Sequence, residues 1–382
     1  MLRYFTAGET HGKCLIAVIE GMPAGVKIDK NMVNEELARR QMGYGRGGRM
    51  AIEKDTVEFL SGVRGGYTLG SPITIKIENR DWKNWKNIMG DEAATDEKSV
   101  TTPRPGHADL TGGMKYNHRD LRNVLERASA RETAARVAVG AVCKQLLESF
   151  SIYSDARVVC VGEIEDKSTV FDEEFYKRAK ASPVGFGDMS SELKAIEYIE
   201  DAKKAGESVG GIAEVSVKNV PAGLGSYVQY DRKLDAKIAF SAMSIQAVKG
   251  VEFGMGFLCA KTLGSSVHDE ILYKEEGFAR KTNNAGGIEG GMSNGEPIVV
   301  RAAMKPIPTL YSPLSTVEIN SKEEKKASVE RSDVCAIYAF SVVLDAVVNF
   351  EIANAFLEKF GNDCVEDIKK SYEMYIERIK KY

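Results

Sequence analysis

Two long segments of this 382-residue chain are hydrophobic on nearly every face, and they constrain its fold more than any other feature. Residues 129–150 and 335–360 have helical composition but no broad polar face. A helix that is apolar nearly all round belongs inside a protein, where other layers must cover it. The sequence therefore predicts an α/β fold, a layered β-α-β sandwich with long buried apolar helices between sheets.

Alternating hydrophobicity predicts the strands of these sheets. Residues 73–78 and 213–218 alternate between apolar and polar side chains, which is typical of strands with one buried face. Residues 298–304 are richer in apolar side chains and predict a more fully buried strand.

Other helices are predicted from caps and charge. Asp29 is a candidate N-cap for a helix over residues 30–40, and Asp231 for a helix that begins with it and ends near 243. Residues 362–382 are charged and amphipathic, which predicts a helix on the surface.

Two charged stretches, residues 79–102 and 163–208, are expected to form loops or exposed helices. Neither has the Pro-rich or Gly/Ser-rich composition of an interdomain linker. By length alone, 382 residues favour two or three domains, although one large domain is possible, and we expect the single domain 1–382.

Residues 39–49 mix four arginines with four glycines, and no acid lies nearer than Glu36 and Glu53. Guanidinium groups bind phosphate and carboxylate in a forked geometry, and glycine lets backbone N–H groups approach an anion. The run predicts a binding site for a small molecule with several negative charges. A solvated basic loop and an RGG-like segment for nucleic acid remain alternatives.

The overall charge argues against nucleic acid. The chain has 52 Lys and Arg against 55 Asp and Glu, a formal charge of −3 and a pI near 6.0. Nucleic-acid binders usually have a basic domain or face, whereas here the positive charge is local.

The compartment is predicted from cysteines and from the N-terminus. The six cysteines form no CxxC pair or zinc-type cluster, which favours reduced thiols. We find no signal pattern and no uninterrupted apolar run of membrane-spanning length. A cytoplasmic protein without a membrane segment is expected.

Two of the four histidines lie in glycine-containing loops. His11 is in the sequence GETHG and His107 in RPGHAD. A histidine on a rigid loop beside positive charge can act as an acid or base near neutral pH, although a structural hydrogen bond is the common alternative. No HExxH or other metal spacing occurs, so no metal site is expected.

The beginnings of the two apolar helices carry further candidates. Ser129 and Glu132 have the spacing of a capping box, and a buried helix N-terminus flanked by Arg127 and Arg131 can bind an anion. Asp333 could be the N-cap of the second helix or a functional carboxylate.

A glycine-rich run at residues 283–295 predicts turns and a close approach to something flat or charged. It has neither a Walker spacing nor a dinucleotide fingerprint. The proline-stiffened segment 305–309 could clamp a ligand or simply turn the chain.

With these motifs assembled, the chain resembles the chorismate synthase family over essentially its full length. The matching segments are GETHG (8–12), RRQMGYGRGGRM (39–50), RPGHADL (104–110), RASARETAARVA (127–138), SAMSIQAVKGVEFG (241–254), TNNAGGIEGGMSNG (282–295), MKPIPTL (304–310) and ERSDVCA (330–336).

The resemblance implies a reaction, a cofactor and an assembly. The family converts 5-enolpyruvylshikimate-3-phosphate into chorismate and phosphate by a 1,4-anti elimination that requires reduced FMN without net redox change. The family fold is a β-α-β sandwich, and its members assemble as homotetramers. No reductase-like segment stands out here, so an external flavin reductase is expected as the source of reduced FMN.

The resemblance also implies residue roles. His11 matches a histidine thought to assist the departing phosphate, His107 one thought to protonate the reduced flavin, and Asp333 a carboxylate thought to take a proton from flavin N5. Arg40, Arg46 and Arg49 match substrate-binding arginines, the first two also associated with NADPH. The positions that match FMN contacts are Arg127, Ala128, Ser129, Gln246, Ala247, Gly290, Lys305, Pro306, Ile307, Pro308, Thr309 and Arg331.

The chain departs from some family members at one motif. Ser332 and Val334 stand where those members have histidine and proline, but the arginine and the carboxylate of the motif are kept. Two other classes remain to be tested, a flavoprotein oxidoreductase with net hydride transfer and an RNA-binding protein.

Overall fold

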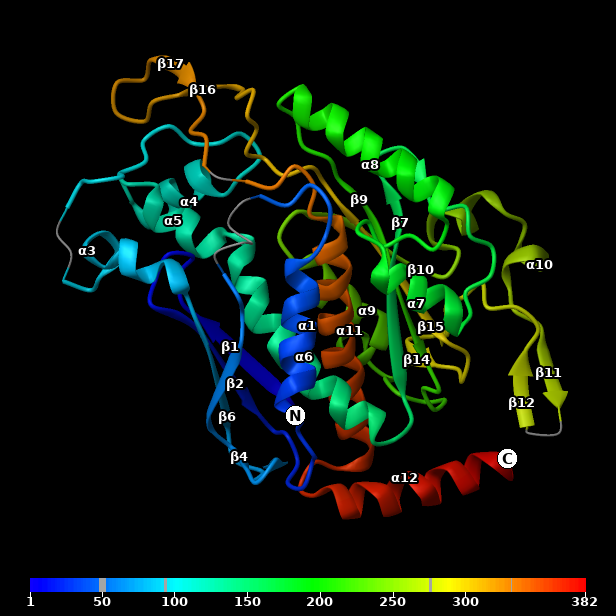
Figure 1. Cartoon of the computed structure of the whole chain (residues 1–382). Helices are drawn as coiled ribbons and strands as arrows, with labels where there is room; N and C mark the ends of the chain where they lie inside the picture. The colour runs from blue at the N-terminus through cyan, green and yellow to red at the C-terminus, as the bar shows by residue number, and fades with distance from the viewer. Residues whose placement is uncertain (48–52, 93–94, 275–276, 331) are drawn as a thin grey trace.

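Two antiparallel β-sheets enclose a layer of helices in the computed structural model of the chain (Figure 1). The structure describes residues 1–47, 53–92, 95–274, 277–330 and 332–382. The first sheet has the strands β1 (Arg3–Ala7), β2 (Cys14–Glu20), β6 (Ile73–Glu78) and β3 (Val57–Ser61), in that order. The second has the order β10 (Val248–Phe253), β15 (Ile298–Met304), β9 (Gly211–Lys218), β7 (Tyr153–Val161) and β8 (Ile164–Glu165).

The two apolar segments form the central helices, α6 (Thr133–Glu148) and α11 (Ile337–Phe360). Helix α6 packs on β1, β2 and β6, whereas α11 packs on β7, β9 and β15. Helix α1 (Lys30–Gln41) lies beside both of them. The predicted β-α-β sandwich with buried helices between sheets is therefore confirmed.

The remaining elements surround this core. The other α-helices are α3 (Lys86–Met89), α4 (Asp109–Tyr116), α5 (Arg122–Ala128), α7 (Glu173–Ala181), α8 (Met189–Lys204), α9 (Leu234–Met243), α10 (Gly264–Val267) and α12 (Val365–Lys380). Short 3₁₀ helices are η1 (Arg80–Asn84), η2 (Ala130–Glu132), η3 (Tyr230–Arg232) and η4 (Gly256–Lys261). Small hairpins pair β4 (Val63–Arg64) with β5 (Tyr67–Thr68), β11 (Ile271–Lys274) with β12 (Gly277–Arg280), β13 (Ile288–Glu289) with β14 (Met292–Ser293), and β16 (Ser315–Val317) with β17 (Glu324–Lys326).

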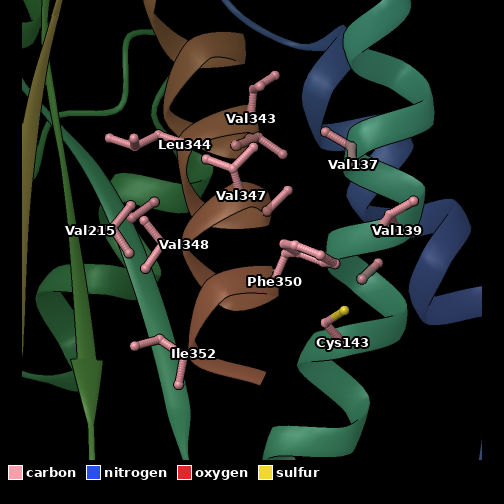
Figure 2. Packing of buried hydrophobic residues seen from close by; sticks show 14 of the residues in the cluster. Val137, Val139, Cys143, Val215, Val343, Leu344, Val347, Val348, Phe350 and Ile352 are labelled. Carbon is pink, nitrogen blue, oxygen red and sulfur yellow. The ribbon is translucent and has the colours of Figure 1, made fainter. Parts of the chain in front are cut away.

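The two central helices approach closely because a glycine faces an alanine between them. A Cβ atom added to Gly140 would lie 2.4 Å from Cα and Cβ of Ala346, so only glycine permits this spacing. Around this contact, Val343, Val347 and Phe350 of α11 point toward α6 (Figure 2). The Leu344, Val348 and Ile352 side chains point toward the five-stranded sheet, as expected for residues spaced by four in a helix (Figure 2).

Helix α11 is buried almost completely. Only Asn354, Glu358 and Lys359 of its 24 residues are not buried. Its length and hydropathy would suffice for a membrane span, but 94% of the apolar window is covered by the rest of the protein. A core helix between two sheets has this composition, so the helix is weak evidence for a membrane segment.

Several local predictions need correction. Residues 213–217 of β9 are all buried, because Arg157 and Arg301 pair with Glu214 on the face that was expected to be open. Strand β15 instead alternates between buried and half-buried side chains. Helix α9 begins at Leu234 rather than Asp231, which lies in the preceding 3₁₀ turn.

Other predictions are confirmed. Asp29 caps α1 by accepting a hydrogen bond from the Asn31 backbone, and β6 has the expected single buried face. Helix α12 is the predicted surface helix, since Ile368 is its one fully buried residue among those described. Residues 163–208 contain α7 and α8, which each bury one face while exposing the other.

Candidate active site

A cavity of about 1030 Å³ lies at the end of the sandwich where α1 ends and α6 and α11 begin. These helix ends lie together near the top of Figure 1. Segments far apart in the sequence form its wall, including the β1–β2 loop and the segment after β15. The beginnings of two buried helices face this region, and helix N-termini favour bound anions.

Most of the predicted site residues that the structure describes line this cavity. They are His11, Arg40, Arg46, His107, Ala128, Ser129, Gln246, Ala247, Lys305, Ile307, Pro308, Thr309 and Asp333. Arg127, Gly290 and Pro306 do not line it, and Arg49 and Arg331 lie outside the described residues.

Arg40 lines the cavity and is held in place by two hydrogen bonds. Its Nε donates to Oγ1 of Thr133 and its Nη2 to the Ala130 carbonyl, both at 2.9 Å. The residue is only 5% exposed, yet Nη1 makes no hydrogen bond to any residue that the structure describes. Its ion pair with Asp55 is long, at 3.6 Å. Burial lowers the pKa of Arg40 to about 10, so the side chain remains cationic at neutral pH.

Arg46 and Asp333 form an ion pair at the cavity wall. Nε of Arg46 lies 3.2 Å from Oδ2 of Asp333, and Oδ1 of Asp333 accepts the Gly47 N–H at 2.6 Å. Helix α11 begins only at Ile337, with Ala336 as its N-cap. The alternative that Asp333 serves as a helix cap is therefore wrong. Its carboxylate instead contacts the Arg46 side chain and the Gly47 backbone N–H.

His107 is held by a buried carboxylate. Its Nδ1 lies 2.6 Å from Oδ1 of Asp109, and a carboxylate can only accept, so Nδ1 carries the proton. Arg104 binds the same carboxylate through Nε and Nη2, at 2.9 and 3.1 Å. Burial alone would raise the pKa of Asp109, but hydrogen bonds and charge from His107 and Arg104 outweigh burial and hold it well below its usual range.

His11 has an equivalent arrangement on the other side of the cavity. Its Nδ1 and its backbone N–H each lie 2.8 Å from one oxygen of Glu126. Arg122 donates to the same carboxylate at 3.1 Å. Burial would raise the pKa of Glu126, but the hydrogen bonds from His11 and the charge of Arg122 lower it. Each histidine therefore has its Nδ1 bound to a buried carboxylate.

The predicted capping box at Ser129 is only half formed. The Ser129 hydroxyl accepts from the Arg131 backbone at 3.3 Å, but α6 begins four residues later. Glu132 does not complete the capping box, because its carboxylate accepts hydrogen bonds from Thr6, Arg136 and Gln246.

Arg131 does not add free charge at this helix end as expected. It donates to both oxygens of Asp55 at 2.7 Å and to Asn79. The buried Arg131–Asp55 pair stabilises the start of the helix. Arg131 also lines the cavity, but its charge is largely balanced by Asp55.

The remaining predicted FMN positions divide into two groups. Lys305 lines the cavity and donates to the Gly106 carbonyl at 3.1 Å, while burial and then the charge of Lys249 lower its pKa. Arg127 instead binds the Gly8 carbonyl and Thr6.

Gly290 lies in the β13–β14 turn of the glycine-rich run. The predicted turns are present there, but the close approach is to backbone. A Cβ added to Gly287, for example, would lie 2.4 Å from the Pro297 carbonyl oxygen.

The described part of the cavity wall is predominantly cationic. Seven lysine and arginine side chains line it, against three carboxylates. Three of these cations, Arg104, Arg122 and Arg131, are partly neutralised by carboxylates behind the wall. The positive charge that remains favours an anionic ligand.

Sequence reasoning assigned no role to several residues of this site. Glu126 lies 115 residues from His11, so no local pattern links them. Asp109 could have been found, because a carboxylate two residues after a loop histidine can reach its Nδ1. Trp85 and Lys98, from a segment expected to be a loop or exposed helix, also line the cavity.

A cationic cavity lined by histidine and carboxylate side chains is typical of an enzyme that acts on an anionic substrate. The comparisons with known proteins are specific. The family model described as chorismate synthase matches residues 2–357. The chain belongs to the chorismate synthase family.

Similar proteins cover the chain from end to end. The chorismate synthase of Geobacter metallireducens is 54% identical over 393 aligned positions, with all of both chains covered. That of Alkaliphilus metalliredigens is 57% identical, with 98% of this chain and 99% of the relative covered. A crystal structure of chorismate synthase superposes with a TM-score of 0.82 and 44% identity, covering 100% of this chain and 99% of that one.

The chain therefore has the function of this family. It is a carbon–oxygen lyase that acts on a phosphate ester, in the shikimate pathway of aromatic biosynthesis.

Proposed function

We propose that this cavity binds 5-enolpyruvylshikimate-3-phosphate together with reduced FMN, and that it eliminates phosphate to give chorismate without net redox change. The observation that carries the proposal is one cavity whose wall joins His11, His107 and Asp333 to Arg40 and Arg46. Its volume, about 1030 Å³, is at the upper end for ligand sites and leaves room for two ligands.

Two buried polar atoms support this fit. Among the described residues, Nη1 of Arg40 and Oε1 of Gln246 make no hydrogen bond, although both side chains line the cavity. A buried polar group without a partner is costly, so such atoms indicate places where a ligand completes the hydrogen bonding. Arg40 suits a carboxylate or phosphate of the substrate, and Gln246 suits an N–H donor such as the flavin ring carries.

The protein contributes orientation, charge and proton transfer. Arg40 and Arg46 hold substrate anions and stabilise the negative charge that develops on the departing phosphate. His11 and His107 each exchange a proton with bound molecules through Nε2, since Nδ1 is engaged by a carboxylate. Asp333, beside Arg46, takes up the proton that the substrate loses as phosphate departs. Reduced FMN, held by the walls near Ser129, Gln246 and the 305–309 segment, supplies electron density transiently when bound.

Catalytic use of flavin is the first expected result. Under anaerobic conditions with photoreduced FMN, the protein should release phosphate and chorismate for many turnovers per flavin. A flavoprotein oxidoreductase with net hydride transfer would instead oxidise one flavin for each product. Simultaneous measurement of phosphate and flavin absorbance distinguishes the two, and one-to-one consumption would sink the proposal.

Arg46→Ala is expected to lower kcat/KM by about 10- to 150-fold, or roughly 1.5–3 kcal/mol, mostly through a higher KM for substrate. Arg46→Lys should restore only part of this, because an ammonium cannot replace the forked guanidinium. Arg39→Ala is the matched control in the same run, since Arg39 pairs with Glu36 and does not line the cavity. Equal kcat/KM for wild type and Arg46→Ala would remove Arg46 from the site.

We also propose an external reductant, a cytoplasmic location and a homotetramer. The purified protein with FMN should then leave NADPH unoxidised unless a flavin reductase is added.

The six cysteines are free thiols, which suits a reducing compartment. Large exposed apolar side chains such as Tyr230, Phe240 and Phe257 are frequent in the sequence between residues 227 and 278, which supports self-association. A monomeric mass in solution would contradict the tetramer.

Buried side chains of both sheets belong to one hydrophobic cluster, which supports a single domain over residues 1–382. One cooperative unfolding transition is expected by calorimetry, and two separated transitions would argue for two domains.

A further inference from the structure

The indole ring of Trp85 stacks directly on the imidazole of His11. The ring centroids are 3.8 Å apart and the planes are inclined by 17°. Trp85 comes from the segment between β6 and α4, and both rings line the cavity. A stack of this geometry restricts rotation of the imidazole, which a single hydrogen bond at Nδ1 does not do by itself.

The indole is itself fixed. Its Nε1 donates to Oδ2 of Asp81 at 3.1 Å, and Asn84 donates to the other oxygen of that carboxylate at 2.7 Å. Two cations also lie over the indole, the Lys98 ammonium at 3.9 Å and the Arg122 guanidinium at 5.2 Å from the ring centroid. Trp85 is therefore a rigid platform for His11 rather than a loosely packed side chain.

The charged groups around His11 come from two segments. Glu126 and Arg122 belong to α5, and Asp81 and Lys98 belong to the segment that carries Trp85. Glu126 holds the imidazole at Nδ1, and Asp81 and Lys98 contact the indole that covers it.

We propose that Trp85 is a positioning residue for the elimination. Trp85 sets the plane of the His11 ring while Glu126 holds Nδ1, and together they direct Nε2 toward the part of the cavity that receives the departing phosphate. This inference rests on the proposed role of His11. It adds a residue from the charged stretch 79–102, to which the proposed function assigns no reacting group.

Intrinsic fluorescence tests the stack without any substrate. The chain has two tryptophans, Trp82 and Trp85, so Trp82→Phe leaves Trp85 as the sole indole. Removal of a stacked ring changes the surroundings of the indole. The emission of Trp85 in Trp82→Phe should therefore change in intensity and wavelength when His11→Gln is added, and acrylamide should quench it more strongly because one ring face is uncovered. Emission and quenching that are the same with and without His11 would overturn the stacking in solution.

Kinetics test the positioning role. Trp85→Leu should lower kcat by about 10- to 100-fold with little change in FMN binding, because small displacements of a catalytic group are costly. Trp85→Phe, which can still stack, should recover part of the loss. Trp82→Leu is the matched control, since Trp82 does not line the cavity, and it should keep the wild-type kcat.

A double-mutant cycle separates this inference from the function on which it rests. If Trp85 acts through His11, then Trp85→Leu should cost nothing further in the His11→Gln background. A wild-type kcat for Trp85→Leu alongside an impaired His11→Gln would overturn the positioning role only. A wild-type kcat for His11→Gln would overturn both the positioning role and the proposed role of His11.

Discussion

Asp333→Asn is expected to lower kcat by about 10²- to 10⁴-fold, the range typical for loss of a general base. Asparagine keeps an oxygen that can accept the Gly47 N–H, so the local backbone should persist. It removes the negative charge that lies 3.2 Å from Arg46. The KM for substrate should therefore stay constant or fall, because Arg46 is no longer neutralised by Asp333. Steady-state kinetics with reduced FMN under anaerobic conditions measure both constants.

The structure makes this variant a clean test. Asp333 does not cap α11, whose N-cap position is Ala336, so Asp333→Asn should not weaken the helix, and the melting temperature should change little. Asp172→Asn is a suitable control, since Asp172 caps α7 away from the cavity and asparagine is also a good cap. Near-normal kcat in a folded Asp333→Asn protein that binds FMN would show that the carboxylate only holds Gly47 and Arg46 in place.

His107→Ala should cause a loss of kcat of similar size, about 10²- to 10⁴-fold. The reason is the loss of an imidazole whose Nδ1 is held by Asp109 and whose ring lines the cavity. Asp109 retains Arg104 as a partner, so the buried carboxylate is not left unpaired and the fold should survive. Because alanine leaves a space for the missing ring, added imidazole should restore part of the activity.

His118→Ala provides the comparison for His107→Ala. His118 is half-buried and does not line the cavity, so its removal should leave kcat unchanged. If both variants lost activity equally, or if His107→Ala retained full activity, the acid role of His107 would be wrong.

Much of the architecture could be predicted from hydrophobic pattern alone. The nearly uniform apolarity of the segments that become α6 and α11 predicted two central helices, and the alternation of β6 predicted its single buried face. These features are local, because burial of a whole helix or of one strand face requires a particular composition at each turn or alternate position.

The ends of elements were less predictable. Asp231 and the Ser129–Glu132 pair have good capping sequences, yet neither caps an α-helix as expected. Tertiary partners decided the second case. Instead of the helix start, Glu132 binds Thr6 of the first sheet, Arg136 of α6 and Gln246 of the segment before β10.

By itself, the sequence determined which segments are buried, where the arginines and histidines cluster, and, through its motifs, which family the chain belongs to. Only the tertiary structure decided the partners of the reactive groups. Glu126 reaches His11 across 115 residues, Asp333 reaches Gly47 across 286, and Trp85 covers His11 from a segment with no apolar pattern. The physical reason is that such contacts depend on how the sheets and central helices pack at one end of the sandwich, and packing of distant segments leaves no periodic trace in the local sequence.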